Sequence, residues 1–206
     1  MGQLVAEAIR LYGQRFWPSL ALGIGPALVG IGVTVVPGLG QLVFVLTAGA
    51  LLLTASYIGA IVLATGSTLT RRSLLTACVA GLLAFLPVPF LVSLFILPAI
   101  AWLAFVGFAV PVAVIEGRGL RGSFARGLTL ARADPIHAVG GLATLAIIGL
   151  LTSFVLFFLL RGQGEATLAA AAFLSILVIS PLLFLGAALL YFDQAARVRS
   201  AKPTRR

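Results

Sequence analysis

This chain has few of the side chains that catalysis and metal binding require. Its 206 residues include one cysteine and one histidine, and only 9% are charged, whereas a soluble domain carries roughly a quarter charged residues. Cys78 has no partner for an internal disulfide, and His137 alone can build neither a metal site nor a nucleophile–base pair in the apolar segments. We therefore expect no catalytic residue, no metal ligand set and no cofactor, and a protein that is not an enzyme.

Charge is also missing from the long apolar runs. The chain is 61% hydrophobic and has a mean hydropathy of +1.19, which is typical of a protein that lives in a bilayer. Ionisable side chains at membrane depth are costly and usually functional. Their absence disfavours proton relays and carboxylate-lined cation pathways.

Six apolar runs are long enough to cross a membrane, because about 20 helical residues span its hydrocarbon core. The stretch 73–115 is too long for a single crossing at about 1.5 Å per residue, so we interpret it as a hairpin with its turn around 94–98. The sequence predicts an all-α, polytopic membrane helical bundle forming a single membrane domain over 1–206. The expected spans are 17–36, 42–65, 73–94, 97–115, 138–160 and 166–192.

Two further segments have the pattern of amphipathic helices that lie in the membrane interface. Residues 3–16 carry apolar side chains on one side and polar ones on the other, with Arg15 as an exception. In the polar segment between Pro111 and Pro135, Leu120, Phe124 and Leu128 share one face of a helix. We expect both helices on the bilayer surface, and a basic tail at 193–206.

The basic side chains predict the orientation of the spans. With six crossings, 13 of the 14 Lys and Arg residues fall on the side of the N-terminus, and only Arg161 falls on the other. Excess Lys and Arg marks cytoplasmic segments, so both termini are expected in the cytoplasm. The net charge of +9 then faces anionic lipid head groups rather than nucleic acid. A composition poor in Lys and rich in Ala, Leu, Gly and Arg is typical of a GC-rich bacterial genome, and we expect the protein in a bacterial inner membrane.

Polar residues gather at the cytoplasmic ends of the spans, and we expect any binding there. An ion pair of Glu116 or Asp193 with a nearby arginine is expected to order this face. The candidate contacts of the cytoplasmic face are Glu116, Arg118, Arg121, Arg126, Arg132, Asp193, Arg197 and Arg199. The candidate helix breaks are Pro26, Pro98, Pro111 and Pro181, because proline removes a helical hydrogen bond; at Pro26 and Pro181 a simple kink is the favoured alternative.

Three motifs resemble one family of bacterial membrane proteins. They are an N-terminal amphipathic helix with Tyr12, Phe16 and Trp17, the pattern Pro111, Glu116, Arg126 and Leu130, and the closing run Leu190-Tyr191-Phe192-Asp193 followed by Arg197-Val198-Arg199. Together they are similar to the glycerophosphoryl diester phosphodiesterase membrane-domain family. The resemblance implies a membrane architecture without the catalytic barrel. The family's Arg-Ser pair reads Arg126-Gly127 here.

Two functions stay open at this point. The first is a non-enzymatic scaffold or accessory subunit of a membrane complex, with a protein partner or a second copy of the chain beside it. The alternative is a transporter or lipid-handling protein with a pathway between the proline-broken spans. A membrane anchor for a separately encoded enzyme is a variant of the first.

Overall fold

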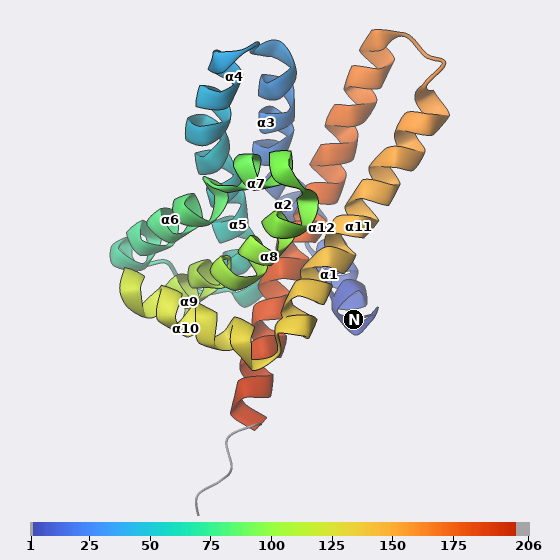
Figure 1. The fold of residues 1–206 in the computed structure, drawn as a ribbon. Coiled ribbons are helices and arrows are strands. Elements are labelled where there is room, and N and C mark those ends of the chain that lie inside the picture. The colour runs from blue at the N-terminus through green and yellow to red at the C-terminus, as the bar shows by residue number, and fades with distance from the viewer. Residues whose placement is uncertain (1, 201–206) are drawn as a thin grey trace, which may run out of the picture.

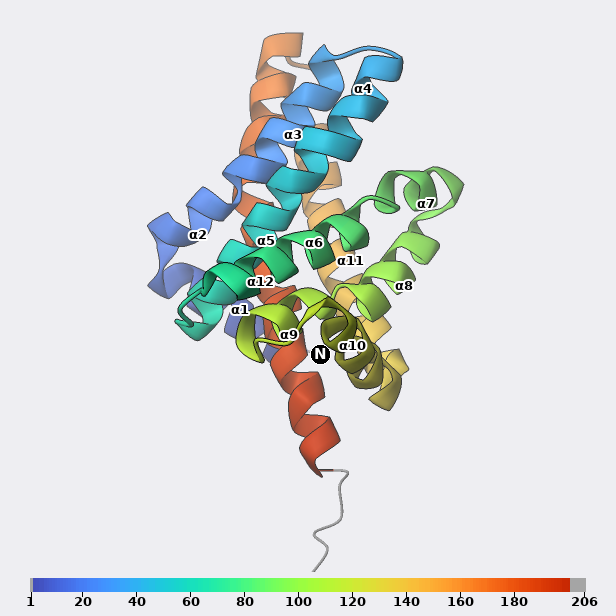
Figure 2. The same ribbon diagram turned by 90° about the vertical axis from the view of Figure 1, so that its left-hand side faces the viewer.

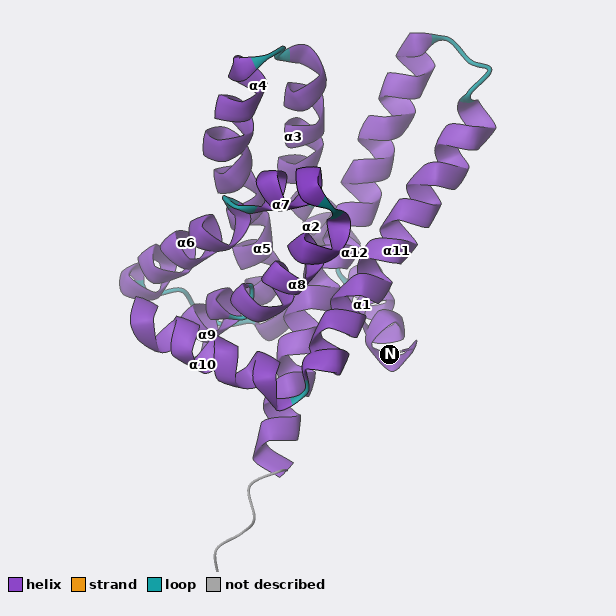
Figure 3. Ribbon diagram, viewed as in Figure 1, coloured by secondary structure: helices purple, strands orange, loops and turns teal. Residues whose placement is uncertain are grey.

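The computed structural model describes residues 2–200, without the side chain of Ser200, and every regular element in that range is a helix (Figures 1 and 3). The all-α prediction is confirmed. Lys202, Arg205 and Arg206 of the expected basic tail lie outside the described residues. In chain order, the elements are α1 (Gly2–Gln14), α2 (Phe16–Leu22), α3 (Ile24–Val35), α4 (Leu39–Phe44), a π-helical turn (Val45–Gly49), α5 (Ala50–Thr65), α6 (Arg71–Phe85), α7 (Val88–Leu94), α8 (Ile96–Val106), α9 (Ala109–Ile115), α10 (Leu120–Ala133), α11 (Pro135–Leu160) and α12 (Glu165–Ser200).

Among the described residues, six helical segments are long and apolar enough to cross a membrane, so the chain is a multi-pass membrane protein. The segments are Phe16–Val35, Leu39–Thr65, Arg71–Leu94, Ile96–Ile115, Pro135–Leu160 and Glu165–Arg199. The chain turns between the third and fourth at Phe95, whose backbone is extended. In the segment Ile96–Ile115, 61% of the most apolar stretch is buried, against 11% in each of the last two segments. The fourth segment is therefore central, whereas the most apolar stretches of the last two segments are largely exposed; the C-terminal part of α12 is buried in the core.

The six segments form three hairpins of unequal reach. The tips of the α3–α4 and α11–α12 hairpins lie at one end of the molecule in both views, whereas α7 lies well below them (Figures 1 and 2). The opposite end, here called the basic end, consists of α1, the start of α6, α10, the start of α11 and the end of α12. These segments carry most of the arginines. The segregation of basic side chains predicted from the sequence thus has a counterpart in space.

Three of the four prolines named as candidate breaks follow a break in the chain. Each is the third residue of the helix that begins there. Pro26 follows the break at Gly23, Pro98 follows Phe95, and Pro111 follows Phe108. The N–H groups of the first helical turn have no partner within the helix, so a proline there costs no hydrogen bond. Each proline is therefore found just inside the segment that it starts.

The fourth expected break, at Pro181, is wrong, because α12 runs without interruption through this residue. Proline still removes the hydrogen bond to the carbonyl four residues earlier, which is that of Leu177. This carbonyl lies so close to Gly23 that a Cβ added there would be 2.0 Å from its oxygen. The glycine between α2 and α3 thus lets the backbone of α12 approach, and packing of α12 against α2 and α3 holds the helix across its proline.

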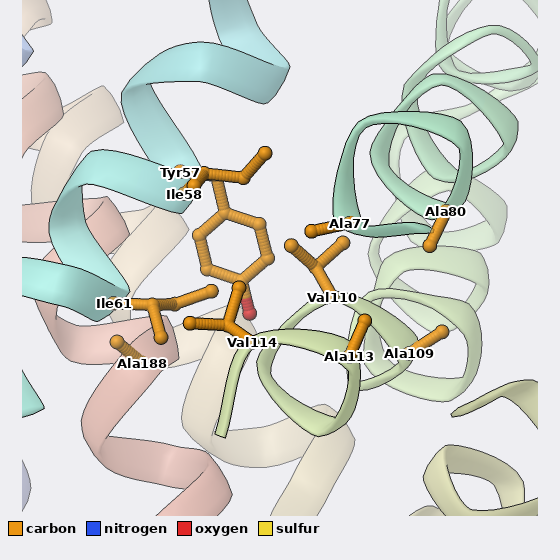
Figure 4. Close-up of a cluster of buried hydrophobic side chains, with 10 residues drawn as sticks. All are labelled: Tyr57, Ile58, Ile61, Ala77, Ala80, Ala109, Val110, Ala113, Val114 and Ala188. Carbon is orange, nitrogen blue, oxygen red and sulfur yellow. The ribbon is translucent and has the colours of Figure 1, made fainter. Parts of the chain in front are cut away.

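The main core lies where α5, α6, α9 and α12 meet (Figure 4). Tyr57 and Ile61 from α5 face Val110 and Val114 from α9, and Ala188 of α12 closes the cluster. Small alanines on α6 and α9 complete the contact, as is usual where membrane helices approach closely. Trp102 of α8 donates its Nε1–H to the Ala84 carbonyl near the end of α6, at 2.9 Å. This bond satisfies a carbonyl that the broken helix leaves without a partner.

The two amphipathic helices pack on protein rather than only on the bilayer surface. In α1, Ala8 is fully buried and Leu4 packs against a second core cluster that includes Leu130 and Tyr191. In α10, the buried residues are Ser123, Gly127, Leu130 and Ala131, and Phe124 from the face that was expected to rest on the bilayer packs against the main core. The small side chains admit α9 closely. Both helices belong to the bundle.

Candidate functional site

The first polar cluster at the basic end is centred on Glu116, the residue after α9. Its Oε2 accepts a hydrogen bond from Arg118 Nε at 2.6 Å, and its Oε1 accepts from Arg126 Nε at 3.3 Å. Tyr191 of α12 donates its hydroxyl to the same Oε1 at 2.9 Å. One carboxylate therefore joins α9, α10 and α12. We call these four residues the Glu116 cluster.

Opposing effects set the charge of Glu116. Burial by itself would raise the pKa of this carboxyl, but the hydrogen bonds from Tyr191, Arg118 and Arg126 together lower the pKa below its ordinary value of 4.5. Hydrogen bonds to the ionised form favour it. Glu116 is thus a carboxylate at neutral pH, and it accepts hydrogen bonds from Arg118, Arg126 and Tyr191.

The position of Gly127 explains how α10 brings Arg126 to Glu116. A Cβ at Gly127 would lie 2.9 Å from the Ala109 backbone nitrogen and 3.0 Å from the Phe108 carbonyl carbon. A backbone cannot yield to such a contact as a flexible side chain can. Only glycine allows α10 to cross the break between α8 and α9 at this distance, which fixes the register of the neighbouring arginine.

The second polar cluster lies where α10 ends and α11 begins. Asp134 caps α11 by accepting the His137 backbone N–H at 3.1 Å, and Pro135 occupies the first helical turn. Arg197 of α12 donates to Asp134 Oδ2 at 3.1 Å and to Asp193 Oδ2 at 3.4 Å. His137 pairs with Asp193 through Nε2. We call Asp134, His137, Asp193 and Arg197 the Asp193 cluster.

A buried glutamine connects this cluster to the core. Gln194 is fully buried, and its Nε2 donates to the Asp134 carbonyl at 3.2 Å, whereas its Oε1 has no hydrogen-bond partner among residues 2–200. A buried amide at a helix junction costs free energy unless it is bonded. Its single bond holds the α10–α11 turn against α12.

The candidate contacts of the basic face divide into two groups. Arg118, Arg126 and Arg197 bind the carboxylates of Glu116, Asp134 and Asp193, so the expected ion pairs of Glu116 and Asp193 are present. In the described part of the chain, the other arginines of the set form no ion pair or hydrogen bond and are exposed. These unpaired arginines are Arg121, Arg132 and Arg199.

Sequence reasoning missed several partners in these clusters. Tyr191 carries part of the resemblance, but nothing in the local pattern says that it reaches Glu116, 75 positions away. Gln194 gives a weak signal as an amide between an aspartate and two alanines. The Asp134-Pro135 pair gives a stronger one, because an aspartate before a proline is a common way to begin a helix.

A cavity of about 310 Å³ lies at the centre of the membrane segments and has almost wholly apolar walls. Pro26 lines it from α3, Tyr57 from α5, Ile100 from α8, Leu145 from α11 and Phe184 from α12. Of two hydroxyls in the lining, that of Ser180 donates to the Ile176 carbonyl of its own helix. The cavity suits an acyl chain or another apolar molecule, and not an ion.

Within residues 2–200, no group of three or more His, Cys, Asp or Glu side chains is arranged to hold a metal ion. Comparisons with protein-family models, with curated proteins and with solved structures returned no match. The resemblance to the phosphodiesterase membrane-domain family therefore rests on the residues that carry it.

Proposed function

We propose that this protein is a non-enzymatic scaffold or accessory subunit in a bacterial inner membrane, with both termini and the basic end in the cytoplasm. The observation that carries the proposal is the division of the arginines at the basic end. Arg118, Arg126 and Arg197 form ion pairs within the protein that join its helices. The other arginines of the set are exposed and form no ion pair with a described residue. The first group builds a rigid platform, and the second is available to lipid or a partner.

The arginines that form internal ion pairs support a rigid platform at the basic end. The Glu116 and Asp193 clusters connect the ends of α9, α10, α11 and α12. Each carboxylate already accepts hydrogen bonds from side chains of the protein, which favours a structural role over turnover of a substrate. Such ion pairs at a partly exposed surface contribute modestly one by one and more as a network.

The exposed group favours anionic lipid. Arg121, Arg132 and Arg199 extend from α10 and α12, and each arginine near an anionic surface contributes about 1 kcal/mol of attraction. Guanidinium also matches phosphate geometry through paired hydrogen bonds. We expect phosphatidylglycerol to stabilise the protein more than phosphatidylcholine does.

Nanodiscs of the two lipids test this expectation. The triple variant Arg121→Gln, Arg132→Gln, Arg199→Gln should lose most of the stabilisation by phosphatidylglycerol, measured as the shift in unfolding temperature. Arg161→Gln is the matched control, because Arg161 lies in the turn between α11 and α12, over the ring of Phe158 at 4.1 Å. Equal stability of the wild type in both lipids would remove the lipid part of the proposal.

Subunit character is tested by extraction from native membranes in a mild detergent. A scaffold or accessory subunit should elute with the same membrane protein in constant ratio through two successive purification steps. A monodisperse solitary protein that carries out transport would contradict the proposal.

The central cavity favours a second candidate, a transporter or lipid-handling protein. Pro26 lines the cavity, so one of the candidate helix breaks lies at its wall, and Ser180, which precedes Pro181 in the chain, lines it as well. Proteoliposome assays of solute flux and of lipid scrambling test this function. Activity in either assay that falls when Ile100 is replaced by Trp to fill the cavity would favour it, and null results in both would count heavily against it.

A further inference from the structure

A cleft lies at the basic end between α1 and the membrane helices. Its cavity of about 490 Å³ is bounded by Glu7 of α1, His137 of α11, and Phe192, Asp193 and Arg197 of α12, among others. This volume is within the range of small-molecule sites. The polar and apolar walls face one space, so an occupant must itself be amphipathic.

A second cavity of about 220 Å³ extends the cleft along α1. The two share Glu7, Ala64 and Leu189, and the second adds Arg10 and Gln14. Glu7 thus lies at the junction of both. Because Ala64 and Leu189 belong to membrane-crossing segments, the floor of the cleft borders the bilayer.

The charges around the cleft differ from those of the whole chain. The protein has five acidic residues and a net charge of +9. Glu7 and Asp193 line the cleft, and Asp134 is bonded to the Arg197 that lines it. Among the described residues that line the two cavities, the basic side chains are Arg10 and Arg197, besides His137. Glu7 is exposed and has no ion pair with a described residue.

The complementary ligand carries an ammonium group for the carboxylates, an anionic group for Arg10, and an apolar part for the floor. A phospholipid with an ethanolamine head group has all three. Its primary ammonium has N–H donors for charge-assisted hydrogen bonds to carboxylates, whereas a quaternary choline has none and needs an aromatic cage instead. Among the described lining residues, Phe192 is the one aromatic side chain, and one ring does not form a cage.

We propose that this cleft binds the head group of phosphatidylethanolamine, with its ammonium held between Glu7 and Asp193 and its phosphate beside Arg10. The site differs from the exposed arginines that contact anionic lipid. It gives α1 a lipid-dependent contact to α12, in addition to the packing of Leu4 and Ala8.

Lipid competition tests the site on the full-length protein. The protein is purified with an equimolar mixture of phosphatidylethanolamine and phosphatidylcholine of identical acyl chains, and bound lipid is counted by native mass spectrometry. The wild type should retain phosphatidylethanolamine preferentially. Glu7→Gln should reduce that preference roughly tenfold, which corresponds to about 1.4 kcal/mol.

Glu165→Gln is the matched control, because Glu165 is an exposed glutamate at the start of α12, near the far tip of its hairpin. Glu7 is preferred to Asp193 for the variant, since Asp193 also holds His137 and Arg197. Equal retention of both lipids by the wild type, or equal preference in the Glu7 and Glu165 variants, would overturn the proposal. A parallel competition with phosphatidylglycerol reports on the exposed arginines, so the two ideas fail separately.

Discussion

Replacing Tyr191 by Phe deletes the hydroxyl that joins α12 to Glu116 and keeps the aromatic ring in the core. Tyr191 is 4% exposed, and its ring contacts that of Phe192 edge to face with centroids 5.4 Å apart. Packing should therefore be unchanged. The measured decrease in the free energy of unfolding then reports on one hydrogen bond, from the Tyr191 hydroxyl to Oε1 of Glu116.

The expected loss lies between two reference values. A hydrogen bond to a charged group contributes about 1.5–3 kcal/mol in soluble proteins, but bonds between membrane helices average about 0.6 and reach about 1.7 kcal/mol. The Glu116 side chain is 20% exposed, so water replaces part of the lost bond, and both arginines keep the carboxylate paired. We expect about 1 kcal/mol, or a fall of roughly 2–4 °C in the unfolding temperature.

Thermal unfolding in one detergent, followed by tryptophan fluorescence, measures this difference. Tyr12→Phe is the matched control, because the Tyr12 hydroxyl is buried without a hydrogen-bond partner among the described residues. Removing an unsatisfied hydroxyl should leave stability unchanged or raise it. If both variants shift the unfolding temperature equally, the Glu116 cluster does not stabilise the junction of α9, α10 and α12.

Three further predictions concern the same architecture. Glu116→Gln should lower stability by about 1–2 kcal/mol at neutral pH. The pKa of Glu116 is below its ordinary value of 4.5 in the folded protein. The contribution of this carboxylate to stability is therefore fully present above the ordinary value and is lost as the pH falls through the folded pKa. Stability curves of the two proteins should therefore converge in acid, and parallel curves would contradict this. Gly23→Ala should cost about 1–3 kcal/mol or more, since its Cβ would meet a backbone carbonyl of α12, whereas Gly30→Ala meets only the end of a flexible isoleucine. Gly127→Ser should destabilise the protein, because its side chain would contact the backbone at the start of α9. Gly122→Ala on the same helix has room for a Cβ and should raise the free energy of unfolding by about 0.5–1 kcal/mol. Chemical unfolding of the Gly23 and Gly30 variants, and of the Gly127 and Gly122 variants, measures these differences.

The sequence determined the number and the type of the helices. Uncharged runs of about 20 residues have no stable state in water or in lipid other than a helix across the bilayer, because every backbone polar group must be satisfied internally. The same local logic placed the turn of the long apolar stretch near Phe95. It also separated basic from apolar segments, since charge follows the position of the membrane surface.

The tertiary structure alone decided which arginines are paired and which helices are continuous. Glu116 and Tyr191 are 75 positions apart, and no local pattern reports on such a contact. Pro181 was a candidate break because the rule for proline is local; α12 packs against Gly23 and is continuous through this residue. The hydrophobic period of α10 predicted a face on the bilayer, but packing brings Phe124 of that face against the main core and Gly127 against α9.

The physical reason for this division is the range of the forces. Burial of apolar residues in a bilayer and internal satisfaction of the backbone act on each segment by itself, so composition determines them. Ion pairs, close backbone contacts and the cleft beside α1 depend on distances of a few ångströms between segments far apart in the chain. Those distances are set by the packing of the bundle, which no single segment encodes.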